Sequence, residues 1–203
     1  MSLINIISEY TQGVKTIDVI SEEHGNNFAE LLKMYVNDRN SSTLREIVTT
    51  KIAGAMDISG KRGYDAEDEN GVCIEIKPRN CTTDSKKIKK LNGSGNFSDF
   101  TWSRYNKMVN DNPFMVISGF VDGMLIYVIK FRFNDSIKFK SRLNSTLSKQ
   151  LPNGDISTKY VRSVEFNYQD YITSNSCEKI WITQDLELYK DYLVKKFYKY
   201  LCD

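Results

Sequence analysis

Apolar residues recur at helical spacing in two segments of the first quarter of the chain. The first spans residues 26 to about 38, and its apolar positions are Phe28, Leu31, Leu32, Tyr35 and Val36. Asn26 and Asn27 precede this stripe and are residues that cap helix N-termini. In the second segment Thr43 and Glu46 have the spacing of a capping box, and the apolar positions are Ile47, Val48, Ile52 and Ala55. We expect two consecutive helices here.

Strict alternation replaces the helical spacing between residues 63 and 80. Apolar side chains at 72, 74 and 76 alternate with Cys73, Glu75 and Lys77, which is the period of a strand with one apolar face. Glu75 and Lys77 therefore point the same way. Asn70-Gly71 is a strong hairpin signal and predicts a partner strand from about residue 63 to 68.

The length of the hairpin loop decides which residue faces Glu75. A two-residue loop, Asn70-Gly71, places Asp65 opposite Ile76 on the apolar side. A three-residue loop from 69 to 71, with Gly71 in a left-handed bulge, places Asp65 opposite Glu75. Directly opposed residues share a face of the sheet. A common site for the two acids thus requires positive φ at Gly71, unless another irregularity of the hairpin brings Asp65 to the face of Glu75.

The pattern predicts a helix and two strands after the hairpin. Residues 92–96 are typical of a flexible loop, and Ser98 or Asp99 is expected to cap a helix that ends before Pro113. The apolar positions of that helix are Trp102, Tyr105, Met108 and Val109. Apolar runs at 114–119 and 124–133 predict two strands, joined around the turn signal Asp122-Gly123.

The chain becomes polar and rich in tyrosine from residue 134 onward. Its composition between 144 and 155 is typical of a loop. Strands are expected at 159–166 and 179–183, and Asp185 is expected to cap a terminal helix that includes Leu186, Leu193 and Phe197. The amides and basic side chains of this region are of the kind that read base edges, although a surface subdomain or a dimer contact explains the same composition.

This order of elements predicts an α/β fold of the mixed α+β kind, with a central mixed β-sheet flanked by helices. The chain has 203 residues, of which 40% are hydrophobic, and this is enough to bury one sizeable core. We expect a single domain over residues 1–203. Its core would span about 22–135, and about 136–203 would form an elaboration with the C-terminal helix.

The net charge of +2 and the pI near 8.2 are only mildly basic, so the distribution of charge is more informative than its sum. Acidic residues gather in the hairpin between 65 and 69. Two basic clusters consist of Lys86, Lys87, Lys89 and Lys90, and of Lys138, Lys140 and Arg142. A basic surface around an acidic centre suits a phosphodiester substrate. Solvated loops are the alternative explanation of both clusters.

Several kinds of chemistry are excluded by what the chain lacks. Its four cysteines show no Cys-x-x-Cys spacing, and His24 is its single histidine, so a zinc site or a histidine-based hydrolase is not expected. There is no Gly-x-Ser-x-Gly elbow and no phosphate-binding glycine loop. Nothing resembles a signal peptide or a membrane span, and we expect a cytoplasmic protein.

An aspartate on one strand followed by Glu-x-Lys on the next resembles the PD-(D/E)XK nuclease superfamily, whose best-known small members are the type II restriction endonucleases. The resemblance covers about residues 28 to 133, and only the short motif matches residue by residue. Tyr64 stands where the family often has proline. The resemblance implies a restriction-endonuclease-like core with the element order α-β-β-β-α-β.

The resemblance also implies roles for individual residues. Asp65 and Glu75 would ligate Mg²⁺, the main-chain carbonyl of Ile76 would add a ligand, and Lys77 would orient or activate the attacking water. Some members use a further glutamate from a preceding helix. Here the candidates are Glu30 and Glu46, although a solvated helix face is the favoured explanation of Glu30 and a helix cap that of Glu46.

The expected function is that of a Mg²⁺-dependent type II restriction endodeoxyribonuclease that acts on double-stranded DNA as a homodimer and is paired functionally with a DNA methyltransferase. The expected DNA contacts are Arg79, Asn80, Lys86, Lys87, Lys89, Lys90, Arg104, Lys138, Lys140 and Arg142. The alternatives are a repair, junction-resolving or phage recombination nuclease on the same core, or a noncatalytic DNA-binding or interaction domain. In the last case Glu-x-Lys would belong to an ordinary sheet surface.

Overall fold

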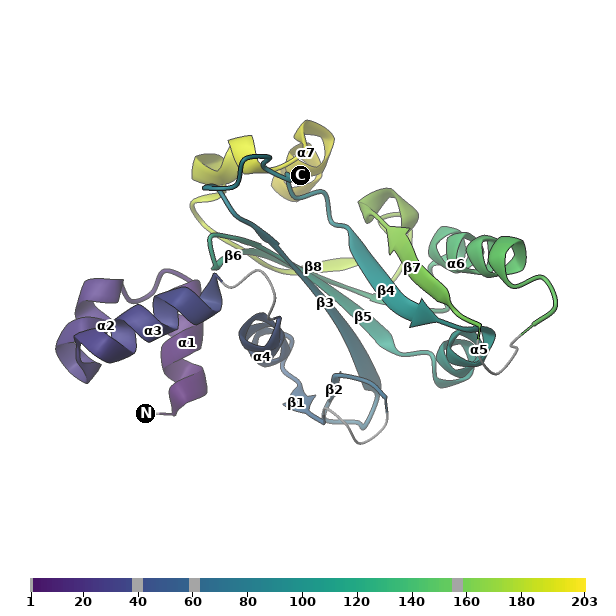
Figure 1. The fold of residues 1–203 in the computed structure, drawn as a ribbon, viewed down its shortest axis with the longest axis horizontal. Helices are drawn as coiled ribbons and strands as arrows, with labels where there is room; N and C mark the ends of the chain where they lie inside the picture. Colours follow the sequence, from purple (N-terminus) through teal and green to yellow (C-terminus); the bar gives the residue numbers. More distant parts are fainter. Residues whose placement is uncertain (1, 38–41, 59–62, 155–158) are drawn as a thin grey trace.

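A six-stranded mixed sheet forms the centre of the computed structural model, which describes residues 2–37, 42–58, 63–154 and 159–203 (Figure 1). In spatial order its strands are β1 (Met56–Asp57), β2 (Ala66–Glu67), β3 (Cys73–Cys81), β5 (Phe114–Val121), β6 (Met124–Arg132) and β8 (Glu178–Ile182). β3 and β5 are parallel, and all other neighbours are antiparallel. The expected mixed sheet flanked by helices is confirmed.

Four helices cover one face of this sheet. They are α1 (Leu3–Thr11), α2 (Ile17–His24), α3 (Asn26–Val36) and α4 (Thr43–Ile52). Their buried residues, such as Ile20 and Val48, pack against Ile74 and Ile76 of β3. The sequence pattern assigned no element before residue 26, where α1 and α2 lie. Ser2 and Thr16 cap α1 and α2 by accepting bonds from main-chain N–H groups three residues later.

The other face carries a second layer of helices and a two-stranded ribbon. The helices are α5 (Trp102–Asp111), α6 (Ile137–Gln150) and α7 (Lys195–Cys202), and the ribbon pairs β4 (Gly95–Phe100) with β7 (Val161–Phe166) in antiparallel register. Short 3₁₀ helices at Tyr168–Asp170 and Leu186–Tyr192 complete the layer. Its core is strongly aromatic, with Phe97, Phe139 and Phe166 fully buried and in ring contact.

Helix α6 replaces the loop that was expected after residue 134. Phe139, Leu143 and Leu147 recur every four residues and are all buried, and so form one helical face. The polar residues between them occupy the solvent side. β8 lies beside β6 at the sheet edge, so residues after 136 complete the main sheet as well as its second layer.

Several expected helix ends were also wrong. Thr101, not Ser98 or Asp99, caps α5, because the latter two lie within β4. α3 starts after Gly25 without a side-chain cap, and Asp38, its expected end, lies outside the described residues. Asp185 makes no capping bond, and a 3₁₀ helix precedes α7 instead of one continuous helix.

The strand pair around Asp122-Gly123 is confirmed. Both turn residues have positive φ, of 46° and 83°, as a tight two-residue hairpin turn requires. Within the described ranges, no helix combines the length and the apolar character needed to cross a bilayer.

Candidate active site

The hairpin of β2 and β3 adopts the register that brings the two acids together. Ala66 pairs with Ile74, and the N–H of Asp68 donates to the carbonyl of Val72 at 3.0 Å, so the loop consists of residues 69–71. Gly71 has φ +74°, as the bulged turn requires. Asp65 precedes the paired residues, and its main-chain N–H donates to the carbonyl of Ile74 at 3.1 Å, so Asp65 lies beside β3 within electrostatic reach of Glu75. The three-residue loop is therefore confirmed.

Side chains fix this hairpin at both ends. Asp68 Oδ1 accepts hydrogen bonds from the main-chain N–H groups of Asn70 and Val72, at 2.9 and 2.8 Å, and so shapes the loop. At the other end Tyr64 is buried and its hydroxyl donates to Asp111 Oδ2 of α5 at 3.0 Å. Tyr64 thus ties the hairpin to the next helix.

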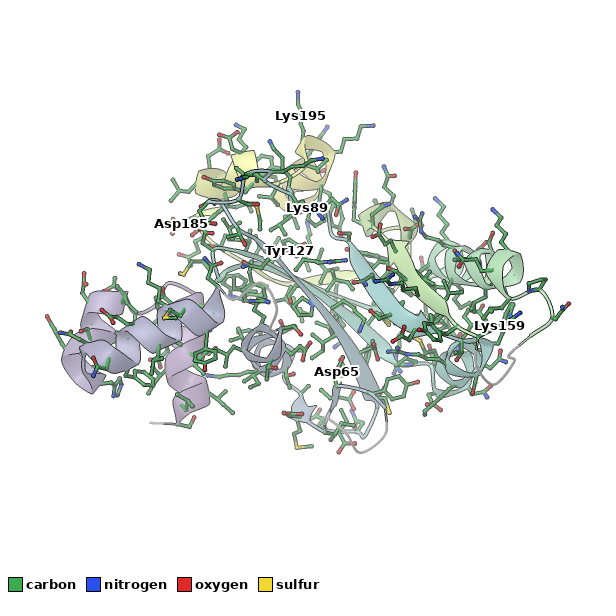
Figure 2. All side chains as sticks on the ribbon, viewed as in Figure 1. Asp65, Lys89, Tyr127, Lys159, Asp185 and Lys195 are labelled. Atoms are coloured by element: carbon green, nitrogen blue, oxygen red, sulfur yellow. The ribbon has the colours of Figure 1, made fainter. Side chains whose placement is uncertain are left out.

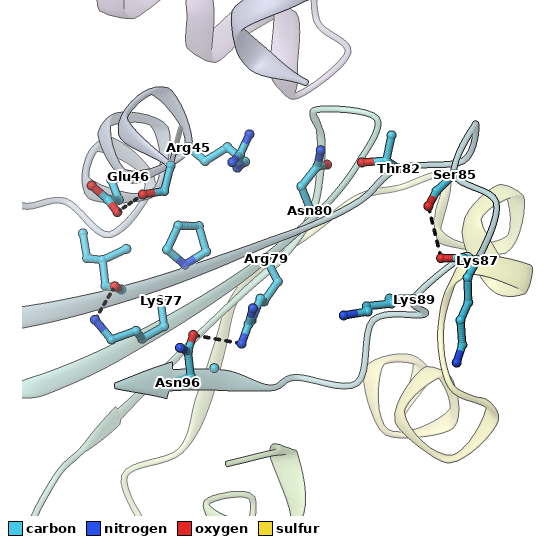
Figure 3. A pocket seen from close by; sticks show the side chains of 14 residues that line it. Arg45, Glu46, Lys77, Arg79, Asn80, Thr82, Ser85, Lys87, Lys89 and Asn96 are labelled. Atoms are coloured by element: carbon cyan, nitrogen blue, oxygen red, sulfur yellow. Dashed lines mark hydrogen bonds between the residues drawn. The ribbon is translucent and has the colours of Figure 1, made fainter. Parts of the chain in front are cut away.

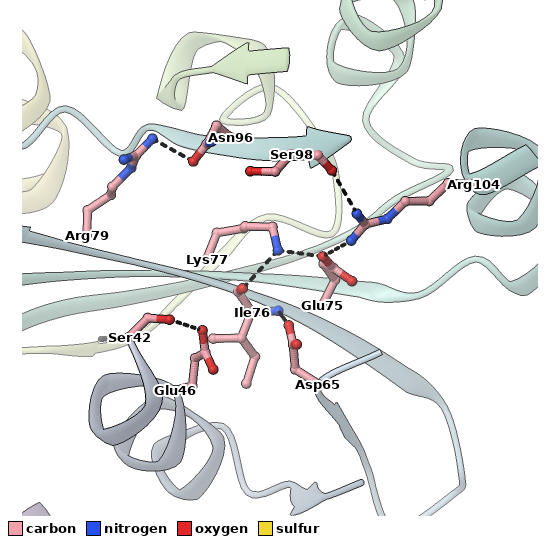
Figure 4. Close-up of polar contacts among 10 residues, drawn as sticks. All are labelled: Ser42, Glu46, Asp65, Glu75, Ile76, Lys77, Arg79, Asn96, Ser98 and Arg104. Carbon is pink, nitrogen blue, oxygen red and sulfur yellow. Dashed lines mark hydrogen bonds and ion pairs between the residues drawn. The ribbon is translucent and has the colours of Figure 1, made fainter. Parts of the chain in front are cut away.

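Glu75 is almost completely buried, with 2% of its surface exposed, and it is held by two cations (Figure 4). Its Oε1 accepts from Lys77 Nζ at 2.5 Å and from Arg104 Nη2 at 2.7 Å. Lys77 Nζ also donates to the carbonyl oxygen of Ile76 at 3.2 Å. A buried carboxylate requires such partners, because desolvation without compensation costs several kcal/mol.

The β4 strand supplies an aromatic surface beneath these cations. Lys77 Nζ lies 5.2 Å and the Arg104 guanidinium 5.3 Å from the centre of the Phe97 ring, within the range of cation–π attraction. Gly95 allows the close approach, because a Cβ there would lie 3.1 Å from Lys77 Cβ and 2.3 Å from the Phe166 ring. Neither Phe97 nor Gly95 was recognised from the sequence. Their only signal was a short alternation within a segment that resembles a loop.

Asp65 occupies a different environment from Glu75. Its Oδ2 accepts from the main-chain N–H of Ile76 at 2.7 Å. The pKa of its carboxyl is raised to about 6, mainly by burial and also by the charge of Glu75, while Lys77 and the Ile76 N–H act in the opposite direction. Raised pKa values of this kind are typical of functional sites.

The edge of β3 beyond this point has no neighbouring strand in the described part of the chain. β2 pairs with β3 only at Cys73 and Ile74, whereas β5 accompanies β3 as far as Cys81. The main-chain N–H and C=O of Ile76 are taken by Asp65 and Lys77. The next residue of β3 whose peptide groups point to this edge is Pro78, and proline has no N–H that would be left unpaired.

A groove of about 660 Å³ follows this free edge between α4 and β4 (Figure 3). Its basic residues are Arg45, Lys77, Arg79, Lys87 and Lys89, and Glu46 is its acidic residue. Arg79 donates to Asn96 Oδ1 of β4 at 2.9 Å, which connects the two walls. The groove therefore offers an excess of positive charge around Ile76 and Lys77, which adjoin the buried Glu75 and the half-buried Asp65.

The oxygen atoms at the head of the groove suit a hard cation. They are the carboxylates of Asp65 and Glu75 and the carbonyl of Ile76, and Mg²⁺ in proteins takes one or two carboxylates and completes its shell with waters and phosphate. Among the described residues no cluster of three or more Asp, Glu, His or Cys has the arrangement of a metal site. The carboxylates alone thus form an incomplete shell, which the carbonyl, waters and a substrate would have to complete.

Glu46 approaches this head and Glu30 does not. Glu46 lines a small cavity with Asp57 and Asp65, and its charge contributes to the raised pKa of Asp65. The Oε1 of Glu46 accepts a hydrogen bond from Ser42 Oγ at 2.5 Å. The partner of Glu46 is thus Ser42, and not Thr43 as the capping-box pattern predicted. Glu30 is exposed on α3 and lines neither the groove nor the small cavity.

The expected DNA contacts fall into separate groups. Lys87 and Lys89 line the groove, whereas Lys86 and Lys90 are exposed outside its wall. The Asn80 side chain also faces the groove, but its amide donates to Asn37 Oδ1 and accepts from the Gly123 N–H, so it holds α3 and the β5–β6 turn together. The expected contacts on α6 do not line the groove; they are Lys138, Lys140 and Arg142.

Comparison of the chain with models of known protein families finds no match, and comparison with curated protein sequences finds no similar protein. What this site does has to follow from its residues and their arrangement.

Proposed function

We propose that this protein is a Mg²⁺-dependent endodeoxyribonuclease that hydrolyses phosphodiester bonds of double-stranded DNA. The observation that carries the proposal is the Asp65 carboxylate on the main-chain N–H of Ile76, between Glu75 and Lys77, whose side chains are bonded to each other. The element order α4, β1, β2, β3, β4, α5, β5 supports a restriction-endonuclease-like core, since it becomes the α-β-β-β-α-β order of that core when β4, which pairs with β7 outside the main sheet, is set aside.

Each residue at the head of the groove has a distinct task in this proposal. Asp65, Glu75 and the Ile76 carbonyl would hold Mg²⁺, which when bound lowers the pKa of a ligated water and polarises the phosphoryl oxygen. Lys77 Nζ lies beside both Glu75 and the Ile76 carbonyl, so it can orient the attacking water and relay its proton. Arg104 positions Glu75 and adds positive charge where the phosphate would gain negative charge.

The groove would carry the DNA backbone to this head. Arg79, Lys87 and Lys89 line it, and cations of this kind neutralise phosphates without reading sequence. The fuller proposal is a type II restriction enzyme that acts in the cytoplasm as a homodimer, paired functionally with a DNA methyltransferase. A twofold pair is the simplest arrangement that cuts both strands of a palindrome. A repair or junction-resolving nuclease would use the same head.

One observation favours a noncatalytic alternative. Glu75 already has two cationic partners and is shielded from water, as in an ion-pair cluster that only stabilises a fold. Asp65 argues against this, because its carboxyl is held without a cationic hydrogen-bond partner in the described structure and its pKa is raised to about 6. A purely structural cluster gains nothing from such a group.

The deciding experiment is incubation of the purified protein with supercoiled plasmid and Mg²⁺, beside the variants Lys77→Ala and Asp65→Asn. Lys33→Ala serves as the matched control, because Lys33 is exposed on α3, far from the groove lining. We expect cleavage by the parent and the control and a loss of at least a hundredfold in both site variants. Full activity in both variants would refute the mechanism, and no cleavage by the parent of linear, supercoiled or branched DNA would favour the noncatalytic alternative.

Substrate choice separates restriction from repair. Cutting at one short sequence in linear and supercoiled DNA supports the restriction enzyme. Cutting that depends on branches or junctions, whatever the sequence, supports the repair or recombination nuclease.

A further inference from the structure

The β4–β7 ribbon has one apolar and one polar face. Its buried residues include Phe97 and Phe100 on β4 and Val161, Val164 and Phe166 on β7. The opposite face presents two directly paired positions, Asn96 beside Glu165 and Ser98 beside Ser163. Ser98, Ser163 and Glu165 are exposed, and Asn96 is partly exposed.

Three hollows meet along this polar face. The groove beside β3 shares Arg79 and Lys89 with a second hollow of about 270 Å³, which Glu165 also lines. Glu165 then lines a third hollow of about 470 Å³ together with Arg142 and Lys149 of α6. In Figure 2 Asp65 and Lys89 lie apart, near β2 and near the C-terminal helices, so the trough formed by these three hollows extends well beyond the two acids.

The trough is mostly lined by basic residues but also contains an exposed acid, Glu165. Its basic lining residues are Arg45, Lys77, Arg79, Lys87, Lys89, Arg142 and Lys149, and the acid Glu46 lines its far end beside α4. Glu165 stands among them, and its carboxylate has no hydrogen-bond or ion-pair partner within the described ranges; only its main-chain carbonyl is bonded, to Arg142 Nε. A surface that contacted phosphates alone would be weakened by an exposed carboxylate. In the major groove, however, a carboxylate accepts a hydrogen bond from the N4 amino group of cytosine.

We propose that the polar face of the β4–β7 ribbon enters the DNA major groove and that Glu165 is a specificity-determining residue there. This inference rests on the proposed nuclease function. A two-stranded ribbon has a width that the major groove admits. The cations on both sides of the ribbon, Arg79 beside Asn96 and Arg142 beside Glu165, would contact the flanking phosphates. Asn96 is held beside Glu165 by its bond from Arg79 and offers its amide N–H groups to a neighbouring base.

The test is selection from a library of randomised duplex DNA by the full-length protein. Binding is measured with Ca²⁺ and cleavage with Mg²⁺, and the parent is compared with Glu165→Gln. We expect the parent to enrich a motif, and the variant to lose roughly tenfold in preference at one base pair while still cutting its DNA. Lys149→Gln should weaken binding to all sequences alike and flatten the salt dependence. Glu22→Gln, an exposed acid of α2, controls for the gain of one positive charge.

The outcomes separate the two proposals. An unchanged motif in Glu165→Gln, or equal binding of all sequences by the parent, overturns the role of the ribbon even if DNA is cut. Failure of the parent to bind or cut any duplex overturns the nuclease proposal, and the role of the ribbon with it.

Discussion

Replacement of Asp65 with asparagine is expected to stabilise the metal-free protein at pH 8 while abolishing cleavage. Burial and the nearby charge of Glu75 raise the pKa of Asp65 from 3.8 to about 6, a difference of about 2 units. At 1.36 kcal/mol per unit, the ionised form costs the folded state about 3 kcal/mol. Solvent screening at this half-buried position reduces the expected gain to about 1 to 2 kcal/mol. Asparagine Oδ1 can still accept the Ile76 N–H.

The sign of the effect depends on pH in a defined way. Because the folded-state pKa is the higher one, the native protein binds a proton between pH 4 and 6 that the unfolded chain has already released. The parent therefore loses stability relative to Asp65→Asn as pH rises through this window. The difference between the two proteins should be smallest near pH 4 and should reach its full value above pH 6.

Urea unfolding followed by tryptophan fluorescence at pH 4 and pH 8, with a chelator present, measures this difference. Glu22→Gln is the control, since an exposed acid should show no such pH dependence. Ca²⁺ added at pH 8 should raise the stability of the parent and leave Asp65→Asn almost unchanged. The reasoning is refuted if the variant is less stable than the parent at pH 8, or if the difference is the same at both pH values.

Three further changes test the rest of the site. Glu75→Gln should lose cleavage and also about 1 to 3 kcal/mol of stability, because Lys77 and Arg104 lose their shared anion; unchanged plasmid nicking would contradict this. Arg104→Met should lower the cleavage rate at saturating Mg²⁺ yet strengthen Ca²⁺ binding in calorimetry, since one competing cation leaves Glu75; weaker Ca²⁺ binding would show that Arg104 supports the ligand geometry instead. Gly71→Ala should cost about 1 to 2 kcal/mol in urea unfolding, because φ of +74° strains any residue with a Cβ; an unchanged midpoint would show that the loop relaxes freely.

The hairpin could be predicted from the sequence because its determinants are local. The alternation around Glu75 and the Asn70-Gly71 signal lie within about fifteen residues. The sequence left two loop lengths open, and the positive φ of Gly71 in the structure is that of the three-residue loop. The Asp122-Gly123 turn was predicted for the same reason. Such elements depend on neighbouring residues more than on the rest of the fold.

The elements that were missed depend on distant partners or on a sparse pattern. β4 is short and polar in composition, and it becomes a strand by pairing with β7, whose residues follow some 65 positions later. The buried stripe of α6 has one apolar residue per turn, at Phe139, Leu143 and Leu147, and asparagine and serine between them conceal it. For the same reason the aromatic surface under Lys77, which β4 provides, was not foreseen from the sequence.

The free edge of β3 has a consequence for solubility. An exposed strand edge is a template on which a second chain can add a strand and start aggregation. Here the Ile76 peptide groups are already bonded to side chains, and Pro78 cannot donate to an incoming strand. A carbonyl oxygen thus remains within reach of a ligand while the backbone around it resists self-association. Pro78→Ala would restore one donor to this edge, and the folded protein should then become more prone to form oligomers at high concentration.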